Sequence, residues 1–148
     1  MSQIDQKIIV LKMSAYDMVL NPGEVLVTSD TIVWCNGEVM GKPKDASDAH
    51  RMLRALSGKT HQVFTGVCLR SSIDQIDFVC ATDVTFAELT DQQIDYYIEA
   101  YKPFDKAGAY GIQEWIGYIG VVGLQGSYFN VMGLPVQKVY SQLQKLKV

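Results

Sequence analysis

One stretch of the chain, residues 25–43 with the sequence VLVTSDTIVWCNGEVMGKP, holds a strand, a turn and a returning segment in close succession. β-branched residues and Trp34 on both sides of Asp30 favour a strand. Asn36-Gly37 predicts a tight hairpin, because both central residues of a type I′ turn need positive φ. The hairpin returns Lys42 close to Asp30. A carboxylate inside an apolar strand is costly unless a cation, a metal or backbone donors compensate, so Asp30 is the first functional candidate.

The rest of the chain alternates helix and strand patterns without an internal repeat or a linker. Residues 3–17 suit either a helix or a strand, and we favour a helix. Apolar spacing and capping residues predict helices over residues 49–56, 94–101 and 136–143, strands over 61–69, 75–86 and 115–124, and loops over 105–113 and 126–135. The last helix is expected to bury Val136, Val139, Tyr140 and Leu143. This order predicts one α/β or α+β domain with a mixed sheet, not a regular βαβ array.

Composition narrows the class of protein. The chain has 148 residues, 48% of them apolar and 20% charged, as expected for one soluble globular domain in the cytoplasm. No run approaches the length of a membrane span. A net charge of −3 and a pI near 5.3 argue against binding to duplex nucleic acid. Cys35, Cys68 and Cys80 form no zinc pattern with the two histidines, so we expect buried or strand cysteines.

Polar residues around the glycine turns are suited to a phosphate and a divalent metal. The candidates from spacing alone are Asp30, Thr31, Lys42, Asp105, Lys106 and Gln113. Oxygen ligands favour Mg²⁺, lysines neutralise phosphate charge, and Asp30 is suited to hold the metal or to orient a water. Equally, Asp30 and Lys42 would form a structural ion pair across the hairpin, and Asp105-Lys106 a surface turn. The residues alone leave both interpretations open.

Four blocks resemble, in order and spacing, the signatures of the Maf family. They are TSDTIVWCNGEVMGKP, AHRMLRALSGKTHQVFTGV, DKAGAYGIQ and GSYFNVMGLP, and the resemblance runs from about Val25 to the end. It implies an elongated, twisted sheet flanked by helices, like that of the inosine triphosphatases, with a cleft between two lobes. It also implies hydrolysis of a nucleoside triphosphate between the α and β phosphates, with Mg²⁺ or Mn²⁺, and an association with septum formation.

The resemblance also assigns roles to residues. Asp30 matches the catalytic acid and metal ligand of the family's (A/S)DT motif. Thr31 and Gln113 match positions tied to nucleobase choice in the branch that prefers dTTP and UTP. Lys42 and Lys106 match lysines expected on the triphosphate. A glutamine amide can both donate to and accept from the imide edge of uracil or thymine. The SGKTHQVFTG block receives no chemical role beyond a strand start and core packing.

The chain departs from the family at one point. It contains no Ser-x-Ser-Pro-Arg-Arg motif, so we expect residues 1–148 to form an N-terminally truncated Maf-like domain. A missing strand would expose a sheet edge that invites pairing into a homodimer. Two hypotheses follow: a dTTP/UTP pyrophosphatase with neither nucleic-acid nor membrane partners, and a catalytically inactive nucleotide-binding or interaction protein that keeps the fold.

Overall fold

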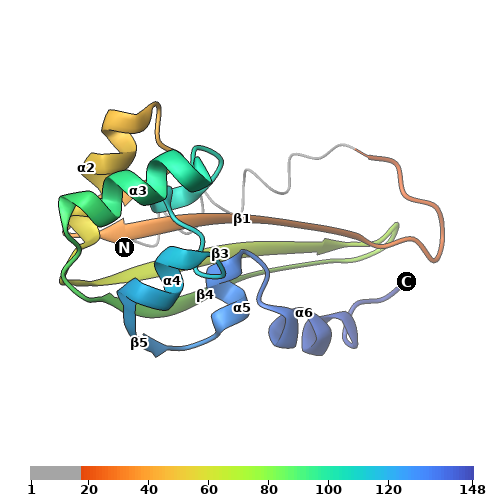
Figure 1. Cartoon of the computed structure of the whole chain (residues 1–148). Coiled ribbons are helices and arrows are strands. Elements are labelled where there is room, and N and C mark those ends of the chain that lie inside the picture. The colour runs from red at the N-terminus through yellow and green to blue at the C-terminus, as the bar shows by residue number, and fades with distance from the viewer. Residues whose placement is uncertain (1–17) are drawn as a thin grey trace.

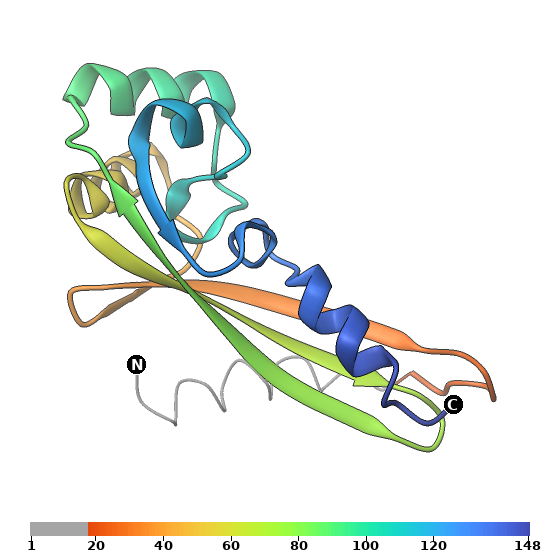
Figure 2. The same cartoon turned by 90° about the horizontal axis from the view of Figure 1, so that it is seen from below.

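The computed structural model describes residues 18–148, and the helix predicted over residues 3–17 lies outside them. The strands are β1 (Leu26–Cys35), β2 (Glu38–Met40), β3 (Thr60–Arg70), β4 (Gln75–Phe86) and β5 (Val121–Gln125). The helices are α2 (Ala46–Leu56), α3 (Asp91–Tyr101), α4 (Trp115–Gly120), α5 (Tyr128–Met132) and α6 (Val136–Leu143), with a 3-10 turn, η1 (Ala107–Ala109). Figures 1 and 2 show an elongated, twisted sheet with α2, α3 and α4 gathered at one end and α6 towards the other. The predicted α/β class is therefore confirmed.

The five described strands have the order β2-β1-β3-β4-β5. Every pairing between them is antiparallel, whereas we expected a mixed sheet. Strands β2 and β3, which α2 connects, do run in the same direction, because both are antiparallel to β1. They are not neighbours, however, since β1 lies between them. The predicted hairpin turn is confirmed, with φ values of 51° at Asn36 and 80° at Gly37.

The main core lies between the sheet and α2, α3, η1 and α4. Asp45 caps α2, and Thr90 and Gln93 form the capping box that opens α3. The two helices are joined by Arg54 of α2, which donates to the carbonyl oxygen of Leu89 at 2.7 Å and also pairs with Asp91. This packed end of the sheet gives the loop at residues 105–113 a rigid support.

Three predictions near the C-terminus are wrong in part. Residues 115–124 were expected to form one strand, but α4 precedes β5 there, and Gly117 of α4 packs directly against the carbonyl group of Ile112. The predicted loop at residues 126–135 contains α5, which Ser127 caps. In α6 only Val139 is buried, whereas Tyr140 is 65% exposed.

The cysteine prediction is confirmed in the described part of the chain. Cys35 and Cys68 are buried, Cys80 is half-buried, and all three are free thiols on β1, β3 and β4. Burial raises the pKa of the Cys68 thiol to about 12, so it stays protonated at neutral pH. Across residues 18–148, no helix combines the length and the apolar character that crossing a bilayer requires.

Candidate functional site

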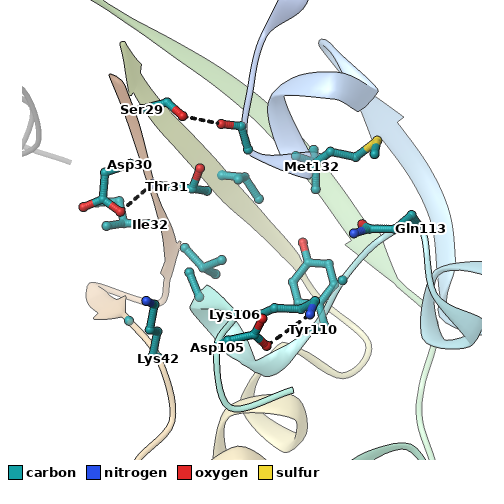
Figure 3. A pocket seen from close by; sticks show the side chains of 17 residues that line it. Ser29, Asp30, Thr31, Ile32, Lys42, Asp105, Lys106, Tyr110, Gln113 and Met132 are labelled. Atoms are coloured by element: carbon teal, nitrogen blue, oxygen red, sulfur yellow. Dashed lines mark hydrogen bonds and ion pairs between the residues drawn. The ribbon is translucent and has the colours of Figure 1, made fainter. Parts of the chain in front are cut away.

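A cleft of about 570 Å³ opens beside β1, and all six residues named as candidates from the sequence, Asp105 included, line it (Figure 3). Its walls come from β1, from the segment after β2, from the loop around η1 and from the end of α5. Figure 3 shows Asp30 and Lys42 towards one end of the cleft and Gln113 at the other, with Lys106 and Tyr110 between them. Segments more than a hundred positions apart line this cavity together, and Ser29 Oγ donates to the carbonyl oxygen of Gly133 at 3.0 Å.

Asp30 lies on the part of β1 that does not pair with β2. Pairing between β1 and β2 stops at Val33↔Met40, so no described strand covers the outer edge of β1 at Asp30. The Thr31 backbone N–H donates to Asp30 Oδ1 at 3.0 Å, which leaves Oδ2 without a hydrogen-bond partner within residues 18–148. Because side chains alternate along a strand, Asp30 and Thr31 leave β1 on opposite sides, as Figure 3 shows. A ligand that touched both would have to wrap around this edge.

Lys42 follows the short strand β2 on an exposed segment. The carbonyl oxygen of the preceding Gly41 accepts from the Gly108 N–H at 3.1 Å, which ties this segment to η1. The described residues contain no ion pair between Asp30 and Lys42. The structural ion pair across the hairpin, one of the two interpretations left open above, is therefore absent, and both charges remain available to a ligand.

Lys106 is held between two carboxylates. Its ammonium group lies 3.1 Å from Asp105 Oδ1 and 3.4 Å from Glu114 Oε1. Partial burial lowers the pKa of Lys106, but the hydrogen bond to Asp105 and the charge of Glu114 outweigh this effect and raise it overall. The hydrogen bond from Lys106 in turn lowers the pKa of Asp105. Lys106 is therefore a permanent cation at the middle of the cleft.

Glu114 was missed in the sequence, because a lone acid after Gln113 carries no recognisable pattern. Its carboxylate accepts from the Tyr97 hydroxyl at 3.4 Å, and the same hydroxyl accepts from the Gly111 N–H at 3.0 Å. A side chain at Gly111 would overlap the Glu114 carboxylate and the Lys106 stem, so only glycine leaves room for this ion pair. Helix α3 thus fixes the cleft loop through the Tyr97 hydroxyl.

Behind the cleft lies a buried pair of rings. The Tyr110 hydroxyl lies 2.6 Å from His61 Nε2, and both side chains are buried. Burial lowers the pKa of His61 to about 4, with the charge of Asp83 opposing the shift. At neutral pH His61 is therefore uncharged and serves to support Tyr110, which lines the cleft.

Helix α5 forms the opposite wall and is attached to the sheet through Asn130. The Asn130 side-chain amide donates to the carbonyl oxygens of Val63 and Cys80 and to Thr82 Oγ1, at 2.9–3.3 Å. Its backbone carbonyl oxygen accepts from Thr65 Oγ1 at 2.9 Å. These bonds hold Val131, Met132 and Gly133 against the cleft.

The arrangement fits a metal that is bound together with a ligand, not a preformed metal cage. Among the residues described, no three His, Cys, Asp or Glu side chains form a group able to hold a metal ion. Asp105 and Glu114 are engaged by Lys106, which leaves Asp30 as the carboxylate suited to a cation. Mg²⁺ in nucleotide sites is commonly held by one or two carboxylates, with phosphate oxygens and waters completing its octahedron.

Comparison with known proteins yields a family and several close relatives. The family model described as Maf-like protein matches residues 3–146. A dTTP/UTP pyrophosphatase of Phocaeicola vulgatus is 62% identical over 135 residues, which span 91% of this chain and 70% of the relative. A protein of the same name from Bacteroides thetaiotaomicron is 56% identical with the same coverage. One from Flavobacterium psychrophilum is 54% identical over 133 residues, or 90% of this chain and 68% of the relative.

Proposed function

Because this chain belongs to the Maf family, as the four sequence blocks predicted, we propose that it is a nucleoside triphosphate pyrophosphatase that hydrolyses dTTP and UTP. The products are the nucleoside monophosphate and pyrophosphate. One observation carries the proposal: a single cleft brings together an acid, two lysines and a threonine–glutamine pair from three segments of the chain. The activity belongs to the cytoplasm, where the nucleotide pool is found.

The charged residues have separate roles on the triphosphate. Lys106 and Lys42 bind phosphate oxygens and neutralise their charge, and Lys106 is already oriented by Asp105 and Glu114. Asp30 takes a proton from the attacking water as the water oxygen bonds to the α phosphorus. The bond from that phosphorus to the bridging oxygen then breaks, and pyrophosphate leaves with the electron pair.

A divalent cation, Mg²⁺ or Mn²⁺, bound with the nucleotide would neutralise charge on the phosphates and polarise the reacting phosphorus. Asp30 is the residue that would hold it, through the Oδ2 atom that is not engaged by the Thr31 N–H. Asp30 would then orient the water as well as the cation.

The remaining lining of the cleft is suited to a pyrimidine. Thr31 and Gln113 both line the cleft, with Met132 as an apolar part of the same lining. A uracil or thymine edge offers a central N–H between two carbonyl oxygens, and a hydroxyl together with an amide can satisfy that pattern.

The test is pyrophosphate release from a panel of nucleoside triphosphates in the presence of Mg²⁺. We expect release from dTTP and UTP, and its loss in Asp30→Asn, because the amide can neither accept the water proton nor hold the cation well. The matched control is Asp95→Asn on the exposed face of α3, which should keep full activity. Nucleotide binding without release by the unmodified chain would refute the proposal and support an inactive binding protein instead.

A further inference from the structure

Thr65 lies in the sequence block that received no chemical role, directly across the sheet from Thr31. We propose that Thr65 determines which bases the cleft accepts, by fixing the Thr31 hydroxyl as a hydrogen-bond acceptor towards the nucleobase. This inference rests on the proposed function, since it assumes that the base binds beside Thr31. Thr65 itself is fully buried and does not line the cleft, so it is a positioning residue and touches no substrate.

The direction of the hydrogen bonds follows from counting protons. Thr65 Oγ1 lies 2.9 Å from the Asn130 carbonyl oxygen and 2.8 Å from Thr31 Oγ1. A carbonyl oxygen can only accept, and two oxygens at this separation repel unless a proton lies between them. The single hydroxyl proton of Thr65 therefore points at Asn130.

Because the Thr65 proton points at Asn130, the hydrogen bond between the two threonines can have only one direction. Thr65 Oγ1 can only accept, so the hydroxyl proton of Thr31 points at Thr65. Thr31 Oγ1 then has no proton left for the cleft and offers lone pairs alone. The Asn130 carbonyl, Thr65 and Thr31 thus form a chain of two hydrogen bonds, which we call the relay. Since Asn130 is anchored to β3 and β4 by its side chain, its carbonyl cannot turn away from Thr65.

An acceptor at this place distinguishes bases by one atom. Uracil and thymine carry a proton on N3 and can donate it to Thr31 Oγ1. Cytosine has a lone pair on N3, so its approach would bring two acceptors together and leave both without a partner. Substrates are distinguished more strongly when the wrong one leaves a buried polar group unpaired than when it merely lacks a methyl group. The relay from Asn130 through Thr65 to Thr31 therefore selects dTTP and UTP against dCTP and CTP.

The test compares Thr65→Val with Thr65→Ser, using kcat/KM for UTP and for CTP. Valine removes the acceptor for the Thr31 proton, so that hydroxyl is free to turn and donate to N3 of cytosine. We expect the preference for UTP over CTP to fall about tenfold or more in Thr65→Val. Serine keeps the relay, and Thr65→Ser should retain the original preference. A preference unchanged in Thr65→Val would overturn the inference.

Two further measurements test the inference even if Thr65→Val misfolds or the chain hydrolyses no nucleotide. Thr31→Val removes the acceptor itself, so it should lower kcat/KM for UTP while changing kcat/KM for CTP little. This variant tests the inference even if Thr65→Val folds poorly. Calorimetric affinities for UMP and CMP report the same preference without turnover. A chain that releases no pyrophosphate but binds UMP more tightly than CMP, and loses that preference in Thr65→Val, would disprove the enzyme and uphold the inference.

Discussion

The two carboxylates beside Lys106 differ in exposure, and this difference decides which one positions the lysine. Asp105 is 74% exposed, whereas Glu114 is 19% exposed. An exposed ion pair is screened by water and contributes little, while a half-buried one holds its partner more firmly. Glu114 also receives the Tyr97 hydroxyl, so its orientation is fixed from α3. At the scale of single residues, Glu114 is therefore the main determinant of where the Lys106 ammonium lies.

Glu114→Ala should raise KM for dTTP about tenfold, with a smaller change in kcat, because Lys106 would keep only its exposed partner. Glu114→Gln preserves an oxygen acceptor at the same place and should retain most of the affinity. The measurement is steady-state kinetics on both variants, with thermal unfolding as a check on folding. Equal impairment of the two variants would show that the charge of Glu114, and not its oxygen, is what matters.

His61 should make folding stability depend on pH. Its pKa in the folded chain is about 4, below the value of 6.5 expected when it is exposed, so the unfolded chain binds the extra proton between these two values. The contribution of His61 to the free energy of unfolding is therefore fully present above pH 6.5. It falls by about 3 kcal/mol as the pH drops towards 4. Urea unfolding at pH 7, 5 and 4 measures the loss. His61→Gln keeps a partner for Tyr110 and should lose less stability in acid, and identical losses would contradict the assignment.

Sequence reasoning singled out Asp30, Lys42 and Gln113 as candidates because each lies in a short motif whose residue types suit a ligand, and all three line the cleft. It could not identify Thr65 or Glu114 as functional, since their roles come from partners that only folding brings near. Thr65 acts through an atom 65 positions away, and nothing in the TGV tripeptide specifies that partner. Local patterns report residue chemistry, but hydrogen-bond direction depends on the tertiary structure.

At the scale of secondary-structure elements, α4 is where local preference and tertiary packing disagree. Residues 115–124 contain aromatic and β-branched side chains that favour a strand, yet the first six form a helix. Gly117 allows this, because that helical turn lies against the carbonyl group of Ile112 with no room for a side chain. The strands β3 and β4 were predicted correctly, over residues 61–69 and 75–86, since their apolar runs and the turn residues between them are local signals.

Gly117→Ala should destabilise the protein although alanine is the better helix former. Helix propensity would stabilise the variant by about 1 kcal/mol, whereas overlap with a backbone carbonyl that cannot rotate away costs about 3 kcal/mol. We expect a net loss of about 2 kcal/mol in urea unfolding, together with weaker nucleotide binding because Gln113 follows Ile112 directly. Gly123→Ala on β5 is the matched control, since its new methyl group would lie 3.5 Å from Thr85, an ordinary contact. A Gly117→Ala protein as stable as this control would contradict the packing argument.

At the scale of the whole molecule, the cleft joins the packed end of the sheet to the wall formed by α5, and the charges of Asp30 and Lys42 have no ion-pair partner among residues 18–148 until a ligand binds. Lys42 and Asp30 form no mutual ion pair, and the described part of the chain has no cluster that would bind a metal alone. Metal and nucleotide should therefore bind as a unit, each completing the site for the other.

Mg²⁺ alone should leave the melting temperature unchanged, and a non-hydrolysable UTP analogue alone should raise it only slightly. Both together should stabilise the fold by about 2.7 kcal/mol at a hundred times the dissociation constant. Differential scanning calorimetry with and without EDTA measures this, and EDTA should also abolish pyrophosphate release. A large shift with Mg²⁺ alone would indicate a metal site preformed by the protein.

The register of β3 against β4 has a kinetic consequence. Their pairing from Thr60↔Thr85 to Arg70↔Gln75 requires closing only the short connection around Ser71–Asp74, whereas the cleft needs contacts such as Ser29 with Gly133, 104 positions apart. Closing a short loop costs less entropy, so the hairpin forms early on the folding pathway and the cleft is completed late. Bound nucleotide then stabilises contacts that are absent from the transition state. It should slow unfolding while leaving the folding rate almost unchanged, so a cell rich in substrate would extend the lifetime of the enzyme that consumes it.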